Sequence, residues 1–423
     1  MSSAVIVLII DVIIAGNGKW FESIFLFNSR KAILLLLALL FVFMYLNRGI
    51  SSKVFPLIFI PIFAFLLWSL VIPIINDVDL NQSISEGLVL LGFALLPLIC
   101  ESKLENTEYI KFKLLILVAI VVNSLVHILM LSSVLGVIPM SEQVISSISK
   151  FLNYKNDTSL NIAVDQYGSV RVGWIGSAFI MLGFGWLRIC NTSKFLYAIL
   201  FLIFIFALYI SGLRGLFGAL ILSFVFAKLI GRYFTRSSFA LSFAVFCSIC
   251  CGALTVSVVS VPANLEYFGL SRDISDSTRS EQTELLLNQF LKNPILGKGM
   301  GGTVDDYERP EEATYAFEQY LLSLLMKTGS LGMILAFYYI YIWTSYLKSR
   351  LLFIDTFDCR SMGETLTFLL LTIFIASASN PYLFNFVGYA YILILVVAVK
   401  NESHYIGKAN NPLVLRRLHH FNI

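Results

Sequence analysis

Four arginines and one glutamate are the residues of this chain best suited to bind and transform a charged substrate. Arg171, Arg214, Arg272 and Arg279 lie between long apolar runs, and Glu318 lies where the next apolar run begins. A guanidinium group stays charged and grips two phosphate oxygens at once through its planar fork. A carboxylate at a membrane edge, partly desolvated and facing a bound phosphate, can act as a general base toward a hydroxyl. The pattern predicts an anion site with a base beside it.

Each of these residues also has a simpler interpretation. Each arginine can simply extend its side chain to the membrane interface or pair with a carboxylate. Arg272, for example, can pair with the adjacent Asp273. Glu318 can be a solvated residue at a helix start, where the helix dipole favours a negative charge.

Tyr320 and Lys327 are further candidates, because they follow Glu318 in the same apolar run. In a helix, Lys327 would lie about 14 Å deeper than Glu318. Charges buried in a membrane are costly and are often functional. Alternatively, Lys327-Thr328-Gly329 marks a helix break or a water-filled cavity.

The elements that must position these residues are membrane helices. Of the 423 residues 58% are hydrophobic and only 13% are charged, whereas soluble domains carry about 25% charged residues. The net charge of +4 is small and scattered, which argues against a nucleic-acid partner. Neither Cys247-x-x-Cys250-Cys251 nor the acidic run 305–312 has a metal-ligand pattern. We expect a lipid bilayer as partner and neither metal nor cofactor.

The apolar runs predict an all-α polytopic protein with about twelve transmembrane helices. About twenty apolar residues span a bilayer core, and the break at Ser211–Arg214 divides a run too long for one span. The predicted spans are about 3–16, 32–47, 54–75, 84–100, 112–138, 172–188, 195–211, 214–231, 238–260, 318–346, 364–380 and 382–400. They form one transmembrane domain over residues 1–400, and residues 401–423 form a short, basic, disordered cytoplasmic tail.

Orientation follows from the basic residues, which concentrate in short connections when both termini are placed in the cytoplasm. The long loops 139–171 and 261–317 then face outward. In the second loop, Thr278-Arg279-Ser280-Glu281 is a capping box that predicts a helix start, and Asn293-Pro294 ends the helix. We expect this amphipathic helix to lie on the outer membrane surface, with Arg279 in its first turn, where free N–H groups favour an anion.

The run Gly297–Gly302 formally matches the dinucleotide-binding pattern G-x-G-x-x-G. That site needs a strand before the glycines and a helix after them, on the cytoplasmic side. Here a helix and a proline precede the glycines, in a segment predicted to face outward. We therefore interpret the glycines as residues that let the loop turn tightly over the bilayer surface.

Motifs along the chain resemble the O-antigen polymerase and O-antigen ligase superfamily of bacterial membrane glycosyltransferases. They are Arg171-Val172-Gly173, Ser211-Gly212-Leu213-Arg214-Gly215, Arg279 followed by Asn293-Pro294-Ile295-Leu296-Gly297-Lys298-Gly299, and Glu318-Gln319-Tyr320-Leu321-Leu322 ending in Gly329-Ser330-Leu331-Gly332. The resemblance implies a GT-C-like membrane fold. It also implies metal-independent, inverting transfer of glycan from undecaprenyl pyrophosphate, on the periplasmic face of the bacterial inner membrane.

The resemblance gives the candidate residues specific roles. Arg214 and Arg279 would hold the pyrophosphate with help from Arg171, and Glu318 would be the base. Ligases resemble one another in a histidine-asparagine pair where this chain has Glu318-Gln319, and glutamate is common there in polymerases.

We therefore expect a polymerase of O-antigen or a related surface polysaccharide, whose donor and acceptor are lipid-linked repeat units. By resemblance alone, a chain-length regulator is a further partner. The first alternative is a ligase that transfers glycan to lipid A core, and a more remote one is a transporter or flippase.

Overall fold

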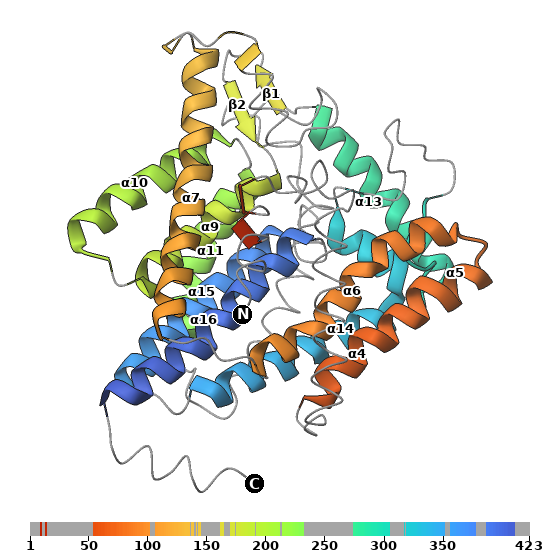
Figure 1. Ribbon diagram of the computed structural model, residues 1–423. Helices are drawn as coiled ribbons and strands as arrows, with labels where there is room; N and C mark the ends of the chain where they lie inside the picture. The colour runs from red at the N-terminus through yellow and green to blue at the C-terminus, as the bar shows by residue number, and fades with distance from the viewer. Residues whose placement is uncertain are drawn as a thin grey trace, which may run out of the picture.

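The structure is a computed structural model and describes a large part of the chain. The described residues are 9–10, 13–14, 54–101, 106–135, 137–138, 141, 143–144, 161–164, 170–173, 175–190, 192–211, 214–231, 274–304, 317, 319–351, 356–377 and 386–410. The elements, shown in Figure 1, are mostly helical. They are α4 (Phe55–Leu66), the π-helix η1 (Leu67–Val71), α5 (Ile72–Ile75), α6 (Leu80–Glu101), α7 (Asn106–Val134), β1 (Asn161–Val164), β2 (Val170–Gly173), the 3-10 helix η2 (Ile175–Ser177), α9 (Ala178–Ile189), α10 (Lys194–Ile210), α11 (Arg214–Gly231), α13 (Ile274–Lys292), α14 (Tyr320–Leu351), α15 (Thr356–Ala376) and α16 (Phe386–Asn410).

The described helices are those of a membrane protein. Three segments are long and apolar enough to cross a bilayer: Phe55–Ile75, Thr107–Ser133 and Tyr320–Leu347. Shorter apolar helices cover Ala178–Ile189, Lys194–Ile210, Leu216–Leu229 and Met362–Ala376. The count of twelve spans and the GT-C-like arrangement stay predictions, because 32–47 and 238–260 lie outside the described residues and 3–16 is described only in part.

The helices form two groups that α16 joins. Helices α4, α6 and α14 lie side by side, while α7 packs on α9 and α10, and α11 packs along α15 (Figure 1). Helix α16 contacts α6 and α14 on one side and α15 and α9 on the other. A continuous apolar core that includes Trp186, Phe112 and Tyr391 extends across both groups, since Phe93 of α6 and Trp343 of α14 belong to it.

The helix expected to start near residue 172 is preceded by a strand. Strand β2 pairs antiparallel with β1, with Arg171 opposite Ala163, so α9 begins at Ala178 rather than near residue 172. The β-branched Val170 and Val172 suit such a strand. The fold is therefore not purely α-helical, and Arg171 lies on a hairpin strand instead of at a helix mouth.

The expected disordered tail is also partly wrong, because α16 continues to Asn410. Glu402 explains the continuation. Its carboxylate accepts hydrogen bonds from Tyr109 Oη (3.0 Å) and Lys113 Nζ (2.7 Å) on α7. In contrast, the predicted break near Ser211 is confirmed, since α10 ends at Ile210 and α11 begins at Arg214.

Helix α14 is broken at Gly329. This residue has φ 65° and ψ −174°, a conformation that essentially only glycine adopts. The segment Asn293–Gly302, which we call the anchor loop, packs against the backbone of α14 at this break. A Cβ atom on Gly329 would lie 2.7 Å from Gly297 N, and one on Gly297 would lie 2.6 Å from Gly329 N. The two backbones approach so closely that neither position can carry a side chain.

Replacing Gly329 by alanine should therefore destabilise the protein. We expect a cost of about 1–3 kcal/mol from the backbone conformation alone, with the clash against the Ile295 carbonyl in addition. The matched control is Gly218→Ala in α11, where a Cβ meets nothing within 4 Å. Thermal unfolding in detergent should show a lower midpoint for Gly329→Ala and an unchanged or higher one for Gly218→Ala. Equal midpoints for the two variants would contradict the packing described here.

Candidate functional site

The anchor loop replaces the helical hydrogen bonds that α14 loses at its break. An unbroken helix would pair Ser330 N–H with Met326 O and Leu331 N–H with Lys327 O. Here all four groups bond to the loop instead. The bonds are Lys298 N to Met326 O (3.0 Å), Gly299 N to Lys327 O (2.8 Å), Ser330 N to Pro294 O (2.9 Å) and Leu331 N to Ile295 O (3.1 Å). The loop therefore satisfies backbone groups that would otherwise be orphaned within an apolar helix.

The π-helix η1 supplies a further bond to the loop. Ile72 N–H donates to Leu67 O, the spacing of a π-turn. By the same spacing Trp68 O would pair with residue 73, which is a proline and has no N–H. Trp68 O instead accepts from Met300 N–H at 2.7 Å, and the Trp68 indole Nε1–H donates to Leu296 O at 2.8 Å.

Side chains from the segments around α6 complete the anchor. Asn76 Nδ2 donates to Gly297 O (3.3 Å) and Lys298 O (3.1 Å), and the Ser83 hydroxyl donates to Met300 O. The glycine-rich run is therefore enclosed by η1, α6 and α14. Gly297, Gly299 and Gly301 have positive φ angles, as expected of glycines that let the loop turn tightly; its place over the bilayer surface stays a prediction.

An ion pair between buried Lys327 and partly buried Glu86 lies at the centre of this anchor. Lys327 is 1% exposed and its Nζ lies 2.6 Å from Glu86 Oε1. The other carboxylate oxygen of Glu86, Oε2, accepts from Gly301 N–H at 2.6 Å. Glu86 thus joins α6 to α14 and to the anchor loop at once. Removing one partner of a buried pair typically costs about 3–5 kcal/mol, because the other charge is left uncompensated.

Sequence reasoning missed Glu86. The available signal was a carboxylate in the predicted span 84–100, since an ionisable residue in a membrane segment usually has a functional or paired role. Lys327 was a candidate, and the break expected near it is confirmed at Gly329.

Helix α13 forms where a helix was predicted but starts earlier, and it is less amphipathic than expected: Gln282, Thr283 and Gln289 are buried with Leu286, whereas Leu287 and Leu291 are exposed. It begins at Ile274, so Arg279 is its sixth residue and lies beyond the first turn. Asp273, directly before this start, is a residue type favoured at N-caps. The helix ends at Lys292, immediately before Asn293-Pro294, as predicted. Its orientation on the outer membrane surface stays a prediction.

One face of α13 packs against α14. Leu286 of α13 forms a buried cluster with Phe317, Val304 and the α14 residues Leu322 and Met326. The Lys327 ammonium also lies 5.7 Å from the centre of the Phe317 ring. Phe317 and Gln319, the two neighbours of Glu318, are both buried. The contact between α13 and α14 therefore positions the chain on either side of the candidate base.

The remaining candidates are placed by their backbones. Arg171 lies on β2, Arg214 is the first residue of α11 and Arg279 lies in α13; their side chains, like all of Glu318 and Arg272, lie outside the described part. Tyr320 is the first residue of α14 and is buried. Within the described ranges, no three His, Cys, Asp or Glu side chains gather in a way that could hold a metal ion.

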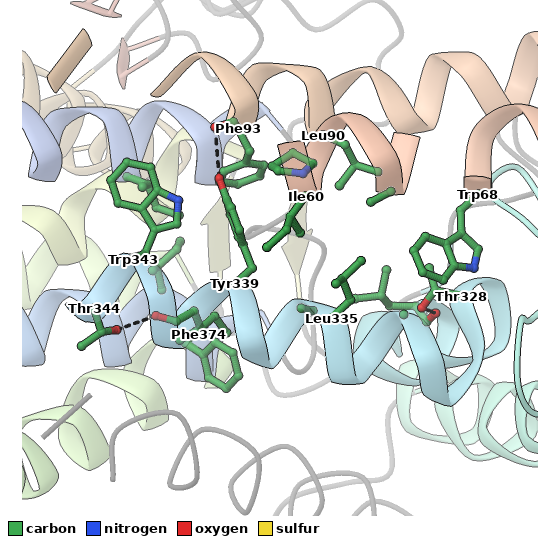
Figure 2. Close-up of a pocket in the computed structure, with 18 of the residues that line it drawn as sticks. Ile60, Trp68, Leu90, Phe93, Thr328, Leu335, Tyr339, Trp343, Thr344 and Phe374 are labelled. Carbon is green, nitrogen blue, oxygen red and sulfur yellow. Dashed lines mark hydrogen bonds between the residues drawn. The ribbon is translucent and has the colours of Figure 1, made fainter. Parts of the chain in front are cut away.

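A cavity of about 150 Å³ runs beside the anchor, between α4, η1, α6, α14, α15 and α16. Figure 2 shows Trp68 and Thr328 at one end, Trp343 and Thr344 at the other, and Tyr339 reaching Phe93 between them. The hydroxyls are engaged within the protein: Thr328 donates to Leu324 O, Tyr339 to Phe93 O and Thr344 to Ile340 O. This lining is suited to an apolar group and offers no charge for a phosphate.

A family model described as O-antigen ligase matches residues 199–337. This match, over about a third of the chain, supports membership of the O-antigen polymerase and ligase superfamily. The matched segment runs from α10 into α14, so it includes Arg214, α13, the anchor loop and Lys327. The comparison with curated proteins gives no match. Members of this family are glycosyltransferase-like membrane enzymes.

Proposed function

We propose that the protein polymerises lipid-linked oligosaccharide repeat units of O-antigen or a related surface polysaccharide. It transfers the growing glycan from undecaprenyl pyrophosphate to the non-reducing end of a new lipid-linked unit, on the periplasmic face of the inner membrane. The observation that carries this proposal is that one family match, over residues 199–337, includes Arg214, Arg279 and Glu318 together.

The proposed reaction assigns one task to each charged group. Glu318 takes the proton of the acceptor hydroxyl as its oxygen attacks the anomeric carbon from the face opposite the pyrophosphate. The bond from that carbon to the pyrophosphate oxygen breaks, and the configuration inverts. Arg214 and Arg279, with help from Arg171, neutralise the charge that grows on the departing pyrophosphate, which stabilises the transition state. The mechanism uses neither a metal ion nor a cofactor.

The second candidate is a ligase, because the matching family model is described as O-antigen ligase. A ligase would transfer the finished glycan to lipid A core. Ligases resemble one another in a histidine-asparagine pair where this chain has Glu318-Gln319, and its histidines lie at positions 127, 404, 419 and 420. His127 is buried in α7, where its Nε2 lies 2.8 Å from Ser177 Oγ. This difference favours the polymerase.

Replacing Glu318 by glutamine should abolish most polymerisation while keeping the shape of the side chain. General bases contribute about 10²- to 10⁴-fold to a rate, so a strain that carries only this variant should accumulate single repeat units. The control is Glu284→Gln on the exposed side of α13, which should give a normal polysaccharide ladder on a gel. A normal ladder from Glu318→Gln would remove the residue from the role of base.

Alanine at Arg214 or Arg279 should block elongation at a single repeat unit. Losing one group that stabilises developing charge typically costs about 10²- to 10³-fold, and added magnesium should not restore the rate. Arg188→Ala, at an exposed position near the end of α9, is the matched loss of one arginine and should leave the ladder intact. The pyrophosphate role fails if either test variant, at wild-type membrane levels, builds polymer of normal length.

A further inference from the structure

We propose that Glu86 is a positioning residue, which fixes α13 and the Glu318 region relative to each other through the anchor loop. This inference rests on the proposed function for its catalytic meaning. The claim that Glu86 fixes these positions depends only on the contacts that Glu86 makes. The carboxylate uses one oxygen for Lys327 on α14 and the other for Gly301 at the end of the anchor loop.

The anchor loop is the C-terminal support of α13. The helix ends at Lys292 and the loop begins at the next residue, Asn293. Arg279 precedes Lys292 by 13 residues, which is about 20 Å along a helix. Leu286 also packs against α14, so this contact and the anchor loop together fix the direction of the helix, and a tilt of a few degrees at the anchor would move Arg279 by more than an ångström. The restraint on the loop therefore limits where the guanidinium can be.

The same carboxylate restrains the Glu318 side of the site. Lys327, which Glu86 holds, lies against the ring of Phe317, the residue before Glu318. Both reactive regions thus depend on one partly buried carboxylate on a third helix, α6. Misplacement by about 1 Å, even from a change far from the chemistry, can cost roughly 10²-fold in rate. The geometry gives Glu86 a part in catalysis although it touches no reacting atom.

Two double variants distinguish this positioning role from a role in which Glu86 only stabilises the folded protein. E86L/K327M and E86Q/K327M both remove the ion pair and leave no unpaired charge, but only glutamine at 86 still offers an oxygen to Gly301 N–H. We expect E86L/K327M to reach wild-type membrane levels while kcat falls roughly 10- to 100-fold, with a smaller change in KM for the lipid-linked repeat. Glutamine at 86 should restore most of that loss.

A second ion pair among the described residues offers a matched control. Lys113 and Glu402 lie 2.7 Å apart, and Glu402 accepts a second hydrogen bond from Tyr109, as Glu86 does from Gly301. This pair joins α7 to α16, away from the anchor loop. K113M/E402L should therefore leave kcat and KM unchanged.

A distance measurement tests the geometry without any activity assay. Spin labels are attached at Glu284→Cys on α13 and Ile334→Cys on α14, both exposed positions, in a chain whose six native cysteines are replaced by alanine. The distance distribution should be narrow in the parent, broad or shifted in E86L/K327M, and narrow again in E86Q/K327M. If E86L/K327M does not accumulate, Glu86→Asp replaces it. Aspartate keeps the charge but is too short to reach both Lys327 and Gly301, so it should also broaden the distribution.

The outcomes distinguish this inference from the proposed function. A broadened distance with no polymerisation by the wild-type protein would support the anchor and refute the polymerase. An unchanged distance and unchanged kcat in E86L/K327M or Glu86→Asp would overturn the positioning role, whatever the reaction. A loss in K113M/E402L equal to that in E86L/K327M would also overturn it, since any buried pair would then have the same effect.

Discussion

Backbone N–H and C=O groups in an apolar membrane segment have no water to pair with, and this constraint determines how the centre of the structure is built. Helix α14 is interrupted at Gly329, and η1 leaves the Trp68 carbonyl without a helical partner. The anchor loop pairs with the groups freed at both places. Glu86 then fixes the loop by a charge-assisted bond to Gly301 and by its contact with Lys327.

This arrangement separates charges that hold the protein together from charges that are proposed to act on substrate. Glu86 and Lys327 pair with one another between the helices, and neither lines the apolar cavity beside the anchor loop. The arginines assigned to substrate lie on β2, at the start of α11 and in α13, three elements distant in sequence. Such a site needs a rigid frame, because each guanidinium arrives from a different support.

Local patterns in the sequence predicted the membrane class, the break before Arg214, and the end of α13 at Asn293-Pro294. These features depend on hydropathy and on the residue types at helix ends, which act over a few positions. The β1–β2 hairpin and the first turn of α13 were predicted incorrectly, because short strands and alternative caps give weak local signals. Glu86 and Lys327 are 241 positions apart in the sequence. Because only folding brings them together, no local pattern could predict that they pair. The glycines between 297 and 302 do turn the chain tightly, as predicted, but their hydrogen-bond partners on other helices could not be predicted for the same reason.

The central claim is that the protein extends lipid-linked glycans without a lipid A acceptor. The most direct measurement supplies purified protein with repeat units on undecaprenyl pyrophosphate and separates the products by size. The account predicts a ladder of two or more repeats on a single lipid when lipid A core is absent. If product forms only after lipid A core is added, and the glycan is found attached to it, the chain is a ligase and the claim is wrong.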